Sequence, residues 1–171
     1  MESFKEEVLS IYSNLQVYYE IANDAFEESE YHLAKNSLPK PDGGYIRAFD
    51  PHRLSFKNGL ISTLFCGSYI DLHIRLAYIM KNGSAPTWKW DNGKGRTNKI
   101  KLEELGVLDV DLLNLIEGFG RARNQIAHEK PIVFGIYSSG SISGTAQESA
   151  KLGITIINCL RKALPLSNTN N

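Results

Sequence analysis

The fold of this 171-residue chain is decided by residues 60–80, which read LISTLFCGSYIDLHIRLAYIM. Apolar residues lie on nearly every side of a helix drawn through 60–65, and such a helix is normally buried in the middle of a bundle. The helix is expected to run over about 52–81, ending at an Asn-Gly pair. Gly59 and Gly67 lie inside it. Because each glycine weakens a helix relative to alanine, we expect other helices to pack closely there.

Helical segments flank this central one on both sides. Residues 2–36 carry one apolar stripe at steps of three and four, without a Pro or Gly. The run 37–44 (SLPKPDGG) breaks that helix, and a loop is expected to about Pro51. After a Gly-containing loop over 83–99, the segment 99–105 predicts a short helix.

Two more helices complete the prediction. A fourth helix, capped by Asp109 or Asp111, runs to about Glu129. A capping-box pattern at 145–148 opens the last helix, which runs to about Leu164. The sequence therefore predicts an all-α fold, an up-and-down bundle of four to five helices in one domain over 1–164. Residues 165–171 are expected to form a disordered tail.

Composition is that of an ordinary globular protein, with 42% hydrophobic and 22% charged residues. Cys66 and Cys159 lie in apolar helical stretches, which predicts two reduced thiols. The N-terminus is acidic and lacks the apolar run of a secretory signal. No apolar stretch reaches the roughly 18–20 residues of a membrane span. We expect a cytoplasmic protein without a membrane segment.

Charge is balanced over the whole chain but not along it. Lys+Arg and Asp+Glu number 19 each, so net charge gives no general argument for nucleic-acid binding. Residues 1–36 hold eight acids and two bases, a net of −6, and the remainder carries +6. This asymmetry could guide the choice of partner, or it could simply reflect a solvated acidic helix face.

The most informative segment is 118–129, which reads GFGRARNQIAHE. Arg123 falls where the apolar stripe of this helix expects a core residue, so its charge must find an anion, a carbonyl or an interface. Asn124 and His128 lie one turn apart, and Arg121 lies a turn earlier on an adjoining face. A plainer explanation is that bases near a helix C-terminus suit the helix dipole.

The run 123–128 (RNQIAH) resembles the Arg-x4-His signature of the HEPN superfamily. The match at residue level covers about 119–129, and the helix order matches over roughly 2–164. The resemblance implies a helical bundle, usually dimeric, and in many members a metal-independent endoribonuclease of toxin–antitoxin, phage-defence or RNA-processing systems. Arg121 would instead give an Arg-x6-His spacing. Lys130 stands where one antitoxin-modified subclass has a tyrosine, which argues against that subclass.

The catalytic residues implied by this resemblance are Arg123, His128 and Asn124. RNA is cleaved when its 2′-hydroxyl attacks the adjacent phosphate, and a histidine can move the protons near neutral pH. A guanidinium can stabilise the phosphorane, and Asn124 can orient the histidine or bind phosphate. No cofactor is expected. No metal site is expected either, because the four histidines (His32, His52, His73, His128) are scattered and no ligand spacing is present.

Auxiliary residues are expected on neighbouring helices. Asp71 and Arg75 form an acid-x3-base pattern like that on the companion helix of some family members, although they could be a simple surface pair. His73, between them, is expected at a helix surface or boundary. We also expect a homodimer whose interface includes the segment from Phe119 to His128, with both motifs facing a shared cleft. An acid such as Glu117, Asp71 or Glu129 should then lie close to Arg121 or Arg123.

The loop over 88–101 combines five bases and one acid with two tryptophans. Aromatic and basic side chains together favour single-stranded RNA, through stacking and phosphate contacts. The alternative is that the tryptophans fold back onto the bundle. The substrate-binding residues predicted here and on the fourth helix are Arg121, Lys94, Arg96, Lys99, Trp88 and Trp90.

Two functions follow from the sequence. The first is a metal-independent endoribonuclease of toxin or defence type, acting on RNA as a homodimer, with an antitoxin or regulatory protein as a further partner. The alternative is a non-catalytic HEPN-like module that binds a nucleotide or a protein. An open, basic site around Arg123 would favour catalysis, and an internally satisfied pair sealed by packing would favour the module.

Overall fold

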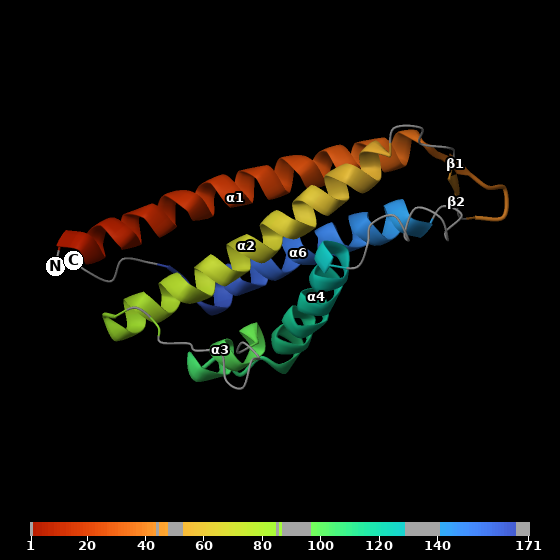
Figure 1. Cartoon of the computed structure of the whole chain (residues 1–171). Coiled ribbons are helices and arrows are strands. Elements are labelled where there is room, and N and C mark those ends of the chain that lie inside the picture. Colours follow the sequence, from red (N-terminus) through yellow and green to blue (C-terminus); the bar gives the residue numbers. More distant parts are fainter. Residues whose placement is uncertain are drawn as a thin grey trace.

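The computed structural model describes residues 2–43, 45–47, 53–84, 86, 97–128 and 141–166, and within these it is an all-α bundle (Figure 1). The predicted fold class is therefore confirmed. Its helices, in chain order, are α1 (Glu2–Lys35), α2 (Leu54–Asn82), α3 (Asn98–Glu104), α4 (Val110–His128) and α6 (Ser141–Ala163).

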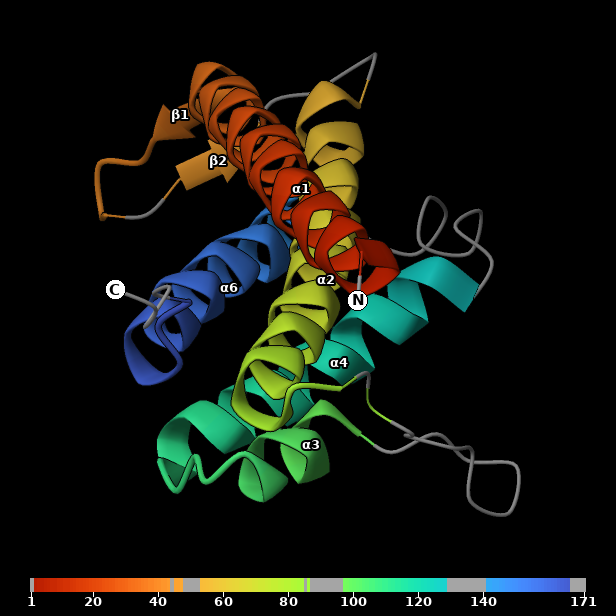
Figure 2. The same ribbon diagram turned by 90° about the vertical axis from the view of Figure 1, so that its left-hand side faces the viewer.

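The long helices run alternately up and down the bundle. In Figure 1, α2 returns alongside α1, α4 runs obliquely back, and α6 follows the direction of α2. The start of α1 and the end of α6 therefore lie at the same end of the molecule. Figure 2 shows α3 at the edge of the bundle, where it lies against the end of α2 and the start of α4.

Helix α2 is the centre of the bundle, as its apolar sequence predicts, because it contacts each of the other described helices. Glycines in α2 and α6 allow these two helices to approach each other closely. A Cβ added to Gly59 would lie 2.8 Å from the carbonyl carbon of Ala146 in α6. A Cβ added to Gly153 of α6 would lie 2.7 Å from the Cβ of Cys66 in α2. The close helix packing expected at glycine is present on both helices.

Helix ends follow local chemistry in two cases. Asp109, not Asp111, caps α4: its Oδ1 accepts from the backbone N–H groups of Asp111 and Leu112, both at 3.1 Å. Thr97 caps α3 by accepting from the N–H of Ile100 at 3.4 Å.

The predicted start of the last helix is wrong. Helix α6 begins at Ser141, so the capping-box pattern at 145–148 lies inside it. Nothing in the sequence of 141–144 blocks a helix, because Gly144 only weakens it. Once the buried turn containing Ala146 and Ala150 is formed, adding residues to the helix is favourable.

The segment predicted as a loop over 37–51 contains a pair of short strands. Strand β1 (Ser37–Pro39) pairs antiparallel with β2 (Tyr45–Arg47), with Ser37 opposite Arg47. Gly43 between them has a φ of +83°, which glycine adopts without strain. Residues 48–52 lie outside the described part.

The segment 165–171, predicted as a disordered tail, is described only at Pro165 and Leu166. Leu166 packs against the core, and its carbonyl accepts from the Tyr12 hydroxyl at 3.5 Å. Among the described helices, none combines the length and the hydrophobicity that a membrane crossing requires.

His73 is a core residue and does not lie at the helix surface or boundary where it was expected; only 1% of it is exposed. Its Nε2 donates to the carbonyl of Leu164 at 2.8 Å, which fastens the end of α6 to α2. Its Nδ1 is buried without a partner among the described residues. Burial lowers the pKa of His73 below its ordinary value of 6.5, outweighing the hydrogen bond to Leu164, and the charge of Arg161 adds to the lowering.

His73 should make the bundle sensitive to acid. Because its pKa is lowered by folding, the unfolded chain binds more protons at a pH below 6.5, so stability is full above that pH and falls as the pH drops towards the lowered pKa. We expect the free energy of unfolding of wild type to decline by up to about 1.4 kcal/mol per pH unit from this group. His73→Gln, which retains a donor for Leu164, should flatten the curve. Denaturant titrations between pH 7.5 and 5 measure this, and equal slopes would contradict it.

Candidate functional site

The core face of α4 is apolar until Arg123. Leu112, Ile116 and Phe119 are buried, and Arg123 follows on the same face of the helix. A side chain of this length can bury its stem while keeping its charge near water. The space for that stem comes from α2: a Cβ added to Gly67 would collide with the Cδ of Arg123 and lie 3.0 Å from its Nη1.

The guanidinium of Arg123 has two described partners. Its Nη1 donates to Asp71 Oδ2 on α2 at 3.0 Å, and its Nη2 donates to Asn124 Oδ1 at 3.2 Å. The side chains of Arg123 and Asp71 remain 29% and 43% exposed. The charge therefore sits at the edge of the core, paired but open to water. Asp71 is one of the three acids expected close to Arg121 or Arg123.

Helix α3 holds Asp71 from the other side. Asn98 Nδ2 donates to Asp71 Oδ1 at 2.6 Å, and Lys101 Nζ donates to Asn98 Oδ1 at 3.2 Å. We call Asp71, Asn98, Lys101, Arg123 and Asn124 the Arg123 cluster. Sequence reasoning missed Asn98 and Lys101. Their spacing of three on a short helix was the available signal, but only the packing of α3 brings them to α2.

A second ion pair lies between α3 and α4. Lys99 Nζ is 3.4 Å from Glu117 Oε2, with side chains 33% and 42% exposed. Exposed pairs of this kind stabilise a protein by about 0–1 kcal/mol. Lys99 was predicted to bind substrate and Glu117 to assist, and the structure brings the two together with the positive charge partly compensated.

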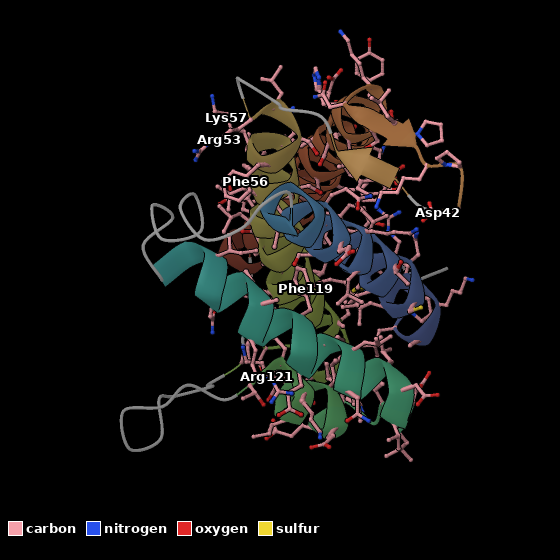
Figure 3. All side chains as sticks on the ribbon, turned by 90° about the vertical axis from the view of Figure 1, so that its right-hand side faces the viewer. Asp42, Arg53, Phe56, Lys57, Phe119 and Arg121 are labelled. Carbon is pink, nitrogen blue, oxygen red and sulfur yellow. The ribbon has the colours of Figure 1, made fainter. Side chains whose placement is uncertain are left out.

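The other predicted site residues are either exposed or outside the described part of the chain. Arg121 is exposed, and Figure 3 shows it on the side of α4 opposite Phe119. Arg75 is exposed one turn beyond Asp71 on α2. His128 is the last residue of α4, but its side chain lies outside the described part. Trp88, Trp90, Lys94, Arg96, Glu129 and Lys130 also lie outside it.

The interface role expected for Phe119 is wrong. Phe119 is 2% exposed in the single chain, and its Cε2 lies 3.0 Å from where a Cβ on Gly153 would be. Its ring therefore fills the contact between α4 and α6. Phe119 was placed in the interface as part of the motif segment 119–128, but it belongs to the apolar stripe that this chain buries in its own core.

The cysteines carry no visible chemistry. Both are free; Cys66 is buried and Cys159 half-buried. Burial raises the pKa of the Cys66 thiol to about 12. Such a thiol is inert. Within the residues that the structure describes, no three His, Cys, Asp or Glu side chains are grouped as a metal site would require.

Comparison with known proteins finds no matching protein-family model, no related curated protein and no similar solved structure. The site is therefore interpreted from its own geometry and from the sequence motif.

Gly67→Ala should disturb the site through Arg123. The added methyl group would occupy the space of the Arg123 stem, so the usual gain of about 1 kcal/mol for replacing a helical glycine by alanine should be lost or reversed. Gly118→Ala is the matched control, because nothing lies within 4 Å of its new Cβ, and it should be stabilising. Thermal unfolding of both variants measures the difference.

A double-mutant cycle assigns the effect to Arg123. If the methyl group collides with the arginine stem, Gly67→Ala in an Arg123→Ala background should recover most of the lost stability, a coupling of about 1–3 kcal/mol. Additive effects of the two substitutions would contradict the contact.

Proposed function

We propose that this protein is a metal-independent, HEPN-type endoribonuclease of toxin or defence type that cleaves RNA by 2′-hydroxyl transesterification. The observation that carries the proposal is the position of Arg123 near the end of α4. Asp71 and Asn124 hold it there, its side chain is 29% exposed, and it stands five residues before His128. An oriented guanidinium near water is what a phosphate needs.

The chemistry can be assigned to named groups. The 2′-oxygen of RNA forms a bond to the neighbouring phosphorus and the bond from phosphorus to the 5′-oxygen breaks, leaving a 2′,3′-cyclic phosphate and a 5′-hydroxyl. His128 moves the protons: one leaves the 2′-hydroxyl and one reaches the departing 5′-oxygen. Arg123 stabilises the negative charge that accumulates on the phosphorane oxygens. Asn124 positions Arg123 through its 3.2 Å hydrogen bond.

Cations around the Arg123 cluster would guide the RNA backbone. Arg121 is exposed on α4, and Lys99 and Lys101 are half-buried on α3. Neutralising successive phosphates with such side chains supplies most of the affinity for nucleic acid and makes it depend on salt.

We further propose that the active form is a homodimer formed through the outer face of α4. Leu115 is exposed there, and a Cβ on Gly118 would meet no atom within 4 Å. Asp109 and Asp111 lie at the start of the helix and Arg121 near its end. An antiparallel pair of α4 helices would therefore match the acidic start of each with the basic end of the other. Because the pair is antiparallel, one copy of the Arg123 end would lie at each end of the paired helices.

A non-catalytic module that binds a nucleotide or a protein is the second candidate. The observation that favours it is that Asp71 already neutralises Arg123, as expected of a pair with a structural role. Cleavage of RNA by the purified protein separates the two functions.

Loss of either motif residue should abolish cleavage. We expect Arg123→Ala and His128→Ala each to slow cleavage of a structured RNA at least about 100-fold in a chelator, because each removes a separate part of the transition-state stabilisation. Product analysis should show 2′,3′-cyclic phosphate ends. Arg53→Ala, which removes an exposed arginine at the start of α2, is the control and should retain activity. Undiminished activity in the Arg123→Ala/His128→Ala variant would refute the proposal.

Added bulk at Gly118 should separate the dimer without unfolding the chain. Gly118→Leu improves the helix propensity of α4 by about 0.8–1 kcal/mol, so a loss of assembly could not be attributed to instability. Size-exclusion chromatography with light scattering should show a monomer with little activity. Asn158→Leu, at an exposed position of α6, adds similar bulk and should remain dimeric. A wild-type protein that is monomeric yet fully active at micromolar concentration would rule out the dimer as the active form.

A further inference from the structure

Two of the positive charges beside the proposed reaction centre are already matched by carboxylates. Asp71 lies 3.0 Å from Arg123, and Glu117 lies 3.4 Å from Lys99. A site meant to capture a strongly charged anion would leave its cations uncompensated. Here the guanidinium of Arg123 keeps N–H groups that can donate hydrogen bonds, but the Asp71 carboxylate offsets most of its electrostatic attraction for an anion.

We infer that Asp71 is a built-in counter-ion of Arg123, which makes the site select singly charged internal phosphodiesters over doubly charged terminal phosphates. The inference rests on the proposed function, and it specifies which kind of phosphate in a nucleic acid Arg123 binds. It also assigns Asp71 a role in specificity that the Arg-x4-His motif does not contain.

The selectivity follows from charge and donor number. A guanidinium has five N–H donors, and the two described bonds use two of them. A phosphodiester carries one negative charge and can still accept hydrogen bonds from Arg123. A terminal phosphate carries about −1.5 to −2 at neutral pH. Its second charge gains little from a neutralised arginine and is repelled by Asp71.

Asp71 cannot simply swing away when an anion arrives. Its second oxygen, Oδ1, accepts from Asn98 at 2.6 Å, and Asn98 is itself bound by Lys101. The carboxylate is therefore held between α3 and α4 whether or not Arg123 is engaged. Asp71 is also 43% exposed at its side chain, so its charge faces the same solvent from which a phosphate would approach.

The test compares two ligands that the protein cannot cleave. Thymidylyl-thymidine has one internal diester and no terminal phosphate, and thymidine 5′-monophosphate has one terminal phosphate; neither has a 2′-hydroxyl. Titration calorimetry at low salt should show that wild type prefers the diester. Asp71→Asn, which keeps an acceptor for Arg123, should improve binding of the monophosphate relative to the diester by roughly fivefold, as expected for removing one charge about 4 Å away.

Matched variants separate the counter-ion from a general charge effect. Asp24→Asn removes the same charge at an exposed position of α1, and the ratio of the two affinities should stay at the wild-type value. Asn98→Asp adds a charge beside Asp71 and should shift the ratio in the opposite direction, towards the diester. That variant also keeps the inference testable if Asp71→Asn does not fold.

The outcomes separate the two proposals. An unchanged ratio in Asp71→Asn, together with loss of diester binding in Arg123→Ala, would overturn the counter-ion and leave the proposed function standing. If Arg123→Ala binds the diester as well as wild type does, the proposed site and the counter-ion both fail. A wild-type preference for the monophosphate would overturn the counter-ion directly.

Discussion

Close approach to α2 is the constraint on which the other features of this bundle depend. Protein interiors pack at crystal-like density, so two helices can come nearer only where a side chain is missing. Gly59 lets the backbone of α6 approach α2. One and two turns further on, Thr63 and Cys66 continue the buried face, and Gly67 provides the space for Arg123. The same central helix thus sets both the core and the position of Arg123.

The elements of the fold were largely predictable because each is encoded locally. Three- and four-residue apolar spacing marks the long helices, and the Asp109 cap and the Asn-Gly pair after α2 mark their limits. What failed depended on contacts between distant residues. The strands at 37–39 and 45–47 are too short to give a pattern of their own. The start of α6 was misplaced because a capping box permits a helix start without requiring it. His73 was placed at a boundary because the sequence does not show that the end of α6 folds back over it.

The candidate site was predictable in part, for a related reason. An arginine on an apolar stripe needs an anion, a carbonyl or an interface, so an acid beside Arg123 was one expected outcome, and Asp71 was among the residues named. Asn98 and Lys101 could not be found this way, because no periodicity links α3 to α2. For Phe119 the wrong expectation came from placing the dimer interface at the motif segment, although the apolar stripe itself predicts a core residue there. An apolar residue at a motif fits a core and an interface equally well, and only the position of Gly153 decides between them.

The hydrogen bond from Asn98 of α3 to Asp71 makes the surroundings of Arg123 depend on whether α3 stays packed against the bundle. A helix of seven residues is not stable alone in water, and α3 persists because Leu102 is fully buried beneath it. We expect such an element to be among the least stable cooperative units of the domain and to open while the rest stays folded. In each opening Asp71 would lose the hydrogen bond from Asn98 although α2 and α4 remain intact. Opening and closing of α3 would thus change how firmly the Asp71 carboxylate is held beside Arg123. This change would occur on a different timescale from the unfolding of the whole bundle.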